Sequence, residues 1–195
     1  MFDHAFLNKF QKNCNDEIIK MRNCSHHYDN EYLSSYHLEG DVLSHMLMVY
    51  NEIDRVASHF DASRKIFAKM TVSDLLKETI VLHDIGKSYS KELDHDKKKA
   101  HFIGHSGISF YKSIDILNKI SSRSEEEKKL ILKTISLHGE FYDLLSVKDA
   151  PSEKRITEII NRFAKEPELF HFVSMHMLCD HYGRITDNKR TNTVF

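Results

Sequence analysis

The feature that most constrains the fold of this chain is its shortage of residues that break helices. Proline occurs only twice, at Pro151 and Pro167, and six of the 195 residues are glycine. Proline removes a backbone donor and clashes with the preceding turn, and glycine costs a helix interior about 1 kcal/mol relative to alanine. No segment gives a clear period-2 alternation typical of a half-buried strand. We therefore predict an all-α fold, a bundle of six or seven helices.

Apolar residues at helical spacing indicate where these helices lie. The expected helical ranges are 3–14, a helix that opens at residue 41 and runs past 53, about 66–84, 105–119, 124–138, 152–164 and 168–182. Asp41 is a suitable N-cap, and Gly86 is expected to end the 66–84 helix. Residues 15–36 are mixed and polar. Residues 87–104 and 139–150 are expected to be connections, the first a long one over the surface.

Size and composition indicate one ordinary globular domain over residues 1–195. A chain of this length buries roughly 70% of its unfolded surface, and 41% of its residues are apolar against 29% charged. The net charge of −1 gives no basic excess for wrapping duplex nucleic acid. No stretch approaches the ~20 apolar residues of a membrane span, and the first residues lack the features of a signal peptide. Three cysteines without a Cys-x-x-Cys pair suit a reduced cytoplasm, so we predict a cytoplasmic protein.

Four histidine and aspartate side chains lie on faces that are expected to point inward. His45 shares a helix face with Val42 and Val49, the pair His83-Asp84 ends an apolar helix, and Asp180 lies on an apolar stripe. Each alone is explained by a satisfied core histidine or half of a buried ion pair. An aspartate on a buried stripe is costly unless it is paired, hydrogen-bonded or bound to a metal. Imidazole nitrogens with carboxylate oxygens suit divalent transition metals, so the set predicts a metal site.

The order of these residues resembles the H…HD…D signature of the HD-domain phosphohydrolases, which are all-helical and metal-dependent. The segment His83-Asp84-Ile85-Gly86-Lys87 is similar to the H-D-x-G-K form of the central motif. The resemblance extends over roughly residues 37–184 and leaves 1–36 as an N-terminal helical extension. It implies an HD-domain helical bundle that holds one or two divalent ions, chosen among Mn, Fe, Co, Ni, Zn and Mg.

Three flanking segments narrow the resemblance. Residues 37–42 with His45 are similar to the H-x-E-G-D-V…H opening of HD domains attached to bacterial tRNA nucleotidyltransferases. Residues 180–184 are similar to their D-x-x-G-R ending, and residues 102–107 to their F-x-G-H-x-x-G segment. Relatives in that branch, including HD modules attached to polynucleotide kinases, act on cyclic phosphates and phosphomonoesters of nucleotides or RNA ends. No nucleotidyltransferase or kinase unit is expected within 195 residues.

The resemblance also suggests roles for further residues around the metal. His105 and His138 would bind a second ion with Asp84 as the bridge, or else hold a phosphate or simply pack. Asp84 would also orient the attacking water. Lys87 would balance phosphate charge, the plain alternative being an ordinary lysine of a helix end.

Three more residues are substrate-binding candidates. Arg184 has the geometry to grip a phosphate bidentately, and His101 would donate to a leaving group. Glu39 is either a substrate contact or a group that supports a ligand. The remaining histidines are interpreted as bystanders: His26, His27, His95 and His171.

The predicted function is hydrolysis of nucleotide or RNA-end phosphoesters by metal-bound water, as a cyclic phosphodiesterase or phosphatase. A divalent ion offsets phosphate charge and lowers the pKa of its water toward ~7. The first alternative is a nucleotidase or dNTP triphosphohydrolase, to which the run Lys97-Lys98-Lys99 would contribute charge; a cyclic-dinucleotide hydrolase is disfavoured by the lack of a G-Y-P element. Other classes are a non-catalytic nucleotide-binding regulatory module and a helical interaction protein without metal. The first helix either closes the core or packs on a second subunit, as in a homo-oligomer.

Overall fold

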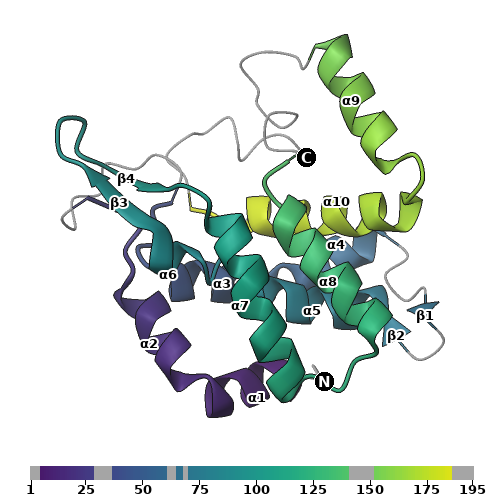
Figure 1. Cartoon of the computed structure of the whole chain (residues 1–195), viewed down its shortest axis with the longest axis horizontal. Helices are drawn as coiled ribbons and strands as arrows, with labels where there is room; N and C mark the ends of the chain where they lie inside the picture. Colours follow the sequence, from purple (N-terminus) through teal and green to yellow (C-terminus); the bar gives the residue numbers. More distant parts are fainter. Residues whose placement is uncertain (1–4, 29–36, 61–64, 68–69, 141–151, 186–195) are drawn as a thin grey trace.

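A computed structural model describes residues 5–28, 37–60, 65–67, 70–140 and 152–185. Over these residues the fold is an all-α bundle with two small hairpins (Figure 1), which confirms the predicted fold class. The helices are α1 (Ala5–Asn13), α2 (Asn15–Asn23), α3 (Val42–Asn51), α4 (Ile53–His59), α5 (Val72–Leu82), α6 (Lys87–Ser90), α7 (His105–Ile120), α8 (Glu125–Leu137), α9 (Glu153–Phe163) and α10 (Pro167–Tyr182). No helix within these ranges is both long and apolar enough to cross a bilayer.

The predicted helices from residue 105 onward correspond to α7 through α10, and the earlier part of the chain is divided more finely. Asp41 caps α3 as expected, accepting a hydrogen bond from the backbone N–H of Ser44 at 2.9 Å. The stretch that follows is split between α3 and α4 at Glu52. The helix expected to begin near residue 66 begins at Val72, because Thr71 and Asp74 form a capping box that fixes its first turn. The hairpin of β1 (Lys65–Phe67) and β2 (Met70–Thr71) precedes it.

Residues 87–104, which we expected to form a long surface connection, contain regular structure. It forms α6 and then an antiparallel hairpin of β3 (Lys91–Asp94) and β4 (Lys99–Phe102), with Asp94 opposite Lys99. Each strand is only four residues long and is exposed or half-buried along its length, with Leu93, Ala100 and Phe102 on one face. Hydrophobic periodicity does not distinguish so short an alternation from a loop. The expected loop at 139–150 lies almost entirely outside the described residues.

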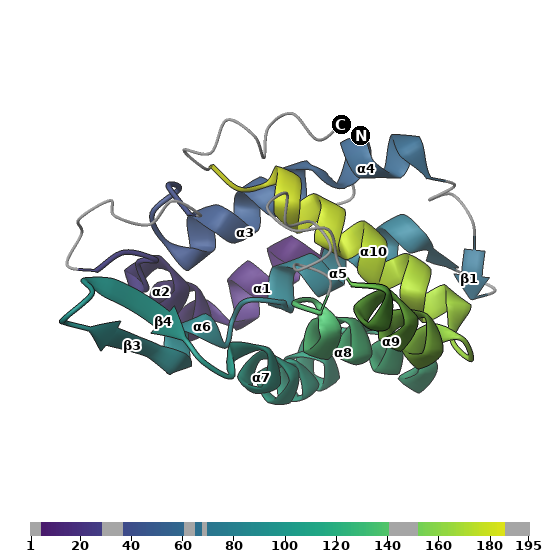
Figure 2. The ribbon, with the colours of Figure 1, turned by 90° about the horizontal axis from the view of Figure 1, so that it is seen from above.

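Helix α5 is the centre of the bundle. It contacts α1, α3, α4, α8 and α10, and Figure 2 shows it between α3 and α10 on one side and α7 and α8 on the other. Nearly all of its side chains are buried, among them Leu75, Leu76 and Ile80. The N-terminal helices belong to the same core, to which α1 contributes Phe6 and Phe10. The C-terminal end of α5 therefore lies inside the molecule, and His83-Asp84 follows it directly.

Candidate metal centre

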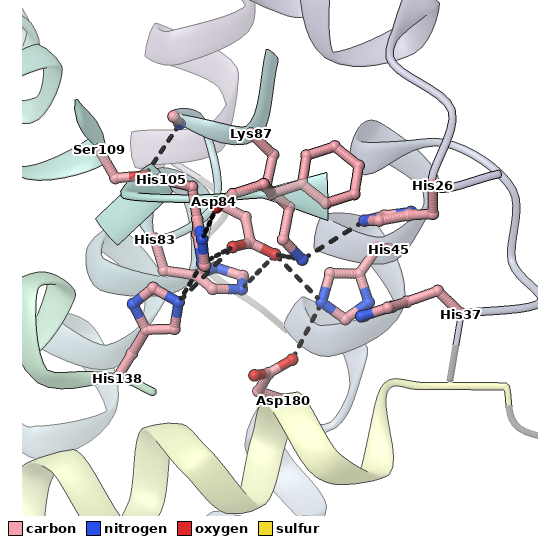
Figure 3. Close-up of polar contacts among 12 residues, drawn as sticks. His26, His37, His45, His83, Asp84, Lys87, His105, Ser109, His138 and Asp180 are labelled. Atoms are coloured by element: carbon pink, nitrogen blue, oxygen red, sulfur yellow. Dashed lines mark hydrogen bonds and ion pairs between the residues drawn. The ribbon is translucent and has the colours of Figure 1, made fainter. Parts of the chain in front are cut away.

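Six side chains from five different parts of the fold meet at the end of α5 (Figure 3). They are His45 of α3, His83 and Asp84 after α5, His105 at the start of α7, His138 at the end of α8, and Asp180 of α10. These are the six residues predicted as metal ligands, and the structure brings all of them together. Five are buried, and His105 keeps 25% of its side chain exposed.

The turn that follows α5 allows two adjacent residues to face one place. α5 ends at Leu82, and Gly86 already caps the next short helix. Gly86 was expected to end the preceding helix, but α5 has already ended at Leu82, and Gly86, with φ −64°, is the N-cap of α6. Glycine is required there because α7 packs against it: a Cβ would lie 2.1 Å from the carbonyl oxygen of His105 and 2.6 Å from the backbone nitrogen of Ser109. The missing side chain thus brings His105 close to Asp84.

The carboxylate of Asp84 lies between two pairs of imidazoles. Its Oδ2 is 3.5 Å from Nε2 of His45 and 3.3 Å from Nε2 of His83. Its Oδ1 is 3.5 Å from Nε2 of His105 and 3.6 Å from Nε2 of His138. Each oxygen therefore faces two histidines, the arrangement that a carboxylate bridging two cations requires.

Asp180 completes the first of these groups. Its Oδ1 lies 3.0 Å from Nε2 of His45. Its Oδ2 accepts a 2.8 Å hydrogen bond from the guanidinium of Arg184, one turn later in the chain. The salt bridge fixes the carboxylate while leaving its other oxygen directed at the histidine.

The second nitrogen of each histidine is held by an acceptor. Nδ1 donates to the carbonyl oxygen three residues earlier in His83 (Ile80, 2.8 Å), His105 (Phe102, 2.8 Å) and His138 (Ile135, 2.6 Å). In His45 the atom at Nδ1 is Oε1 of Glu39, at 2.8 Å. Because these oxygens only accept, Nδ1 carries a proton, and each Nε2 presents a lone pair whenever its imidazole is neutral. This outer hydrogen bond is the usual support of a metal-ligating histidine.

Four lone pairs and two carboxylates thus face one another in a buried space. Such a cluster of acceptors is costly unless a cation lies among them. Among the described residues, Nε2 of His83 and Oδ1 of Asp84 have no hydrogen-bond partner. Donors that share an ion at 2.0–2.2 Å are about 3.0–3.5 Å apart, and the distances here run from 3.0 to 3.6 Å. The residues present therefore fit a divalent metal.

The ionised state of the carboxylates also favours binding of a cation. Burial raises the pKa of Asp84, but the ammonium of Lys87 and the imidazole of His83 outweigh it and hold that pKa well below its usual range. Burial lowers the pKa of His45, but its contacts with Asp180 and Glu39 prevail and raise it. Without metal, a proton on His45 balances the carboxylates, and a metal that binds there takes its place.

Of the four predicted substrate-binding residues, Lys87, Arg184 and Glu39 contact the metal-ligand candidates, and His101 does not within the part of the chain that the structure describes. Lys87 is buried, with Nζ 2.7 Å from Oδ2 of Asp84, and it begins α6 instead of belonging to the last turn of α5. Arg184 lies against Asp180, and burial lowers its pKa to about 10. Glu39 contacts Nδ1 of His45 and accepts a hydrogen bond from the backbone N–H of Ile185. It therefore supports a candidate metal ligand.

His101 is not brought to the cluster by any contact among the described residues. Its side chain is 44% exposed on β4 and lies 3.8 Å from Asp94. Of the expected bystanders, His95 contacts Tyr28 and His171 packs on Phe60, both away from the centre.

Three histidines near the centre are absent from the predicted ligand and substrate set. His37 donates to Oε1 of Glu39 at 2.6 Å, and its place in the H-x-E segment was the available signal. His176 is fully buried one turn before Asp180, with its ring centroid 4.8 Å from that of His83. His26, expected to be a bystander, lies beside Lys87 at 3.4 Å. The sequence around His26 has no periodicity that would have placed it there.

No protein-family profile matches this sequence, and no curated protein matches it. The likeness to the HD-domain phosphohydrolases therefore rests on the motif residues themselves. The structure adds one coarser fact, that buried histidine and aspartate groups lie close enough to hold a metal ion.

Proposed function

We propose that this chain is a metal-dependent phosphohydrolase of the HD-domain type, with Asp84 at the middle of a two-metal centre. The observation that carries the proposal is the convergence of four histidine Nε2 lone pairs on the two oxygens of one buried carboxylate. Apart from the ammonium of Lys87, the atoms directed at this carboxylate are acceptors whenever the imidazoles are neutral, whereas a purely structural cluster would pair each acceptor with a donor.

The donors divide into two groups around Asp84. His45, His83 and Asp84 form one, to which Asp180 adds a carboxylate; Asp84, His105 and His138 form the other. When bound, divalent ions at these positions would offset phosphate charge and activate water. The second group has three protein donors, which leaves room for substrate beside the partly exposed His105. Substrate is therefore expected to approach from the side of α7.

Fixed charges of the protein support anion binding next to these groups. Lys87 and Arg184 lie against Asp84 and Asp180, respectively. Three carboxylates, those of Asp84, Asp180 and Glu39, stand against these two cations. The excess negative charge of the metal-free cluster favours binding of a cation. Because the side chains are almost completely buried, each interaction acts in a medium of lower dielectric than water. When metal offsets the charge of the carboxylates, the positive charges of Lys87 and Arg184 would attract phosphate oxygens.

The substrate class that we propose is a phosphoester of a nucleotide or an RNA end, either a cyclic phosphodiester or a phosphomonoester. It is supported by the three flanking motifs, each of which supplies a site residue: residues 37–42 carry Glu39, residues 102–107 carry His105, and residues 180–184 carry Arg184. The alternative of a triphosphohydrolase is weaker, because Lys97, Lys98 and Lys99 are exposed in the β3–β4 hairpin and Lys97 pairs with Asp94. A non-catalytic nucleotide-binding module remains the alternative of another class, although the ligand set is intact.

Metal content and hydrolysis measured on the same variants test this proposal. We expect the purified protein to retain or require a divalent ion and to hydrolyse bis-p-nitrophenyl phosphate or a nucleoside 2′,3′-cyclic phosphate more readily than a dNTP. Asp84→Ala is expected to lose both metal and activity while its circular dichroism stays helical. Asp94→Asn, a carboxylate change in the hairpin, is the control and should keep both. A protein that neither binds nor needs metal, or an active Asp84→Ala variant, would contradict the proposal.

The number of ions is tested by separating the two ligand groups. His138→Ala should lower the metal stoichiometry from two to one, since it removes a donor of the second group only. A stoichiometry of one in the unchanged protein would support the single-metal alternative.

A further inference from the structure

The N-terminal segment lies outside the part of the chain that carries the family resemblance, yet it supplies a buried side chain to the site. His26 is 3% exposed, and its Nε2 lies 3.4 Å from Nζ of Lys87. Figure 3 shows its ring on the far side of the Lys87 ammonium from His83, His105 and His138. The function proposed above gives His26 no role.

Backbone hydrogen bonds fix the position of His26. Its N–H donates to the carbonyl oxygen of Gly40 at 2.7 Å, and the N–H of Val42 donates to Cys24 at 3.0 Å. The thiol of Cys24 in turn donates to the carbonyl oxygen of Lys87 at 3.5 Å. The segment after α2 is therefore joined both to the start of α3 and to α6.

The ring of His26 is oriented by its neighbours. It stacks on His37 with ring centroids 4.3 Å apart and planes 10° apart, and it meets the edge of Phe102 at 5.6 Å. His37 is held by Glu39, whose same oxygen also contacts His45. The carboxylate of Glu39 thus holds both His45, a metal-ligand candidate, and His37, on which His26 stacks.

Lys87 lies between two acceptors. Its ammonium is 2.7 Å from Oδ2 of Asp84 and 3.4 Å from Nε2 of His26. Because an ammonium only donates, Nε2 of His26 accepts, and the imidazole is neutral. A lysine side chain is a flexible stem that carries a compact charge, so its direction must come from such contacts. Asp84 alone would leave the ammonium free to turn about that carboxylate.

We propose that His26 is a positioning residue that aims the ammonium of Lys87 at a phosphate oxygen of the substrate, so that the N-terminal segment is part of the catalytic unit. The identity of the anion rests on the function proposed above, whereas the contact between His26 and Lys87 does not. The plain alternative is that His26 only fills space in the core.

The contact is tested first on the metal-free protein by a double-mutant cycle. His26→Phe keeps the ring and its stacking but removes the acceptor, and Lys87→Met removes the charge. We expect the shifts in the urea midpoint to be non-additive when the two changes are combined, since each one removes the same interaction. Additive shifts would contradict the positioning role. If His26→Phe folds poorly, His26→Leu, which also lacks an acceptor, takes its place in the cycle, and the same non-additive shift is expected.

The functional part is tested with inorganic phosphate as the probe, by calorimetric titration of the metal-loaded full chain. We expect His26→Phe to weaken phosphate binding roughly three- to tenfold, the size of the net contribution of one ordinary hydrogen bond, with the metal content unchanged. His26→Gln should restore binding, and His26→Phe should have no further effect once Lys87 is methionine. His27→Phe is the matched control, because His27 is equally buried at 3% and is not among the contacts of Lys87.

The outcomes separate this proposal from the function on which it rests. If the protein takes up metal and phosphate binds wild type and His26→Phe equally well, the positioning role alone is contradicted. A wild-type protein that binds neither metal nor phosphate would contradict the proposed function, and the urea cycle would still decide whether His26 holds Lys87.

Discussion

At the scale of single residues, the centre depends on which atom each side chain presents. The sequence indicated His45, His83, Asp84 and Asp180 as a set because histidine and aspartate lay on otherwise apolar helix faces. It could not indicate that Nδ1 of each clustered histidine is held by an acceptor and that Nε2 faces Asp84. Rotamers and hydrogen-bond partners decide that choice, and the partner of His45 is on another element.

Gly86→Ala tests the close approach of α7 to the turn after α5. The added methyl would meet the backbone of His105 and Ser109 at 2.1 and 2.6 Å. We expect a loss of about 1–3 kcal/mol in the free energy of unfolding, as for other overpacked sites. Metal affinity of the group containing His105 should fall with it. Urea unfolding and metal titration measure the two effects.

Gly139→Ala is the control for that change, since a Cβ there meets nothing within 4 Å. It should leave both measurements unchanged. An unaltered Gly86→Ala variant would show that α7 can move away without cost.

At the scale of elements, the helices place ligands by where they start and stop. His83 and His138 cap the C-terminal ends of α5 and α8, and His105 is the first residue of α7. The sequence predicted these ends to within a few residues for α7 and α8. It predicted neither the start of α5, which depends on a capping box, nor the β3–β4 hairpin, whose strands are only four residues long.

Ser124→Ala tests the capping box that begins α8. The Ser124 hydroxyl accepts from the backbone N–H of Glu127, and the Glu127 side chain accepts from the N–H of Ser124. We expect a loss of about 1 kcal/mol in the free energy of unfolding. Metal stoichiometry should not change, because His138 lies at the other end of the helix. Thermal unfolding and metal analysis check both, and a loss of metal would show that α8 transmits the change along its length.

Glu78→Gln tests a buried carboxylate that links α5 to the α7–α8 loop. Burial raises the pKa of Glu78 more than Arg123 and Ser121 lower it. A carboxyl with a raised folded pKa contributes stability below its unfolded value of 4.5, and this is lost as pH rises through the folded pKa. We therefore expect Glu78→Gln to become more stable relative to wild type as pH increases above about 4.5, by urea unfolding across pH 4.5–7.5. A relative gain by wild type would mean that the Arg123 pair outweighs burial.

At the scale of the whole molecule, one core contains both the N-terminal helices and the part that carries the resemblance. Phe6, Phe10 and Met21 share a cluster with Leu76 of α5 and Phe172 of α10. The motif boundaries near residue 37 therefore do not mark a division of the core. The ligands lie at the place where these helices meet, so metal binding and folding are expected to be coupled.

Metal addition tests this coupling. An ion that binds only the folded state stabilises it by about 2.7 kcal/mol at a hundredfold excess over Kd. We expect the melting temperature to rise with added Mn²⁺ or Zn²⁺ and to fall with a chelator, and the rise to be smaller at acidic pH because the imidazoles must be deprotonated to bind. Asp84→Ala should show little response. An equal rise in that variant would place the stabilising ion elsewhere.

The sequence by itself determined the all-α class, most helix positions and four of the ligand candidates, namely His45, His83, Asp84 and Asp180. These follow from local properties: the scarcity of proline and glycine, the helical period of apolar residues, and the cost of an acidic group on a buried face. His105 and His138 were indicated only by the family resemblance. Only the tertiary structure decided that Asp84 faces two pairs of histidines, that Gly86 is required by α7, and that His26 contacts Lys87. The contacts that join different elements here lie 19 to 61 positions apart in the chain, and their energies depend on distances that no local pattern encodes.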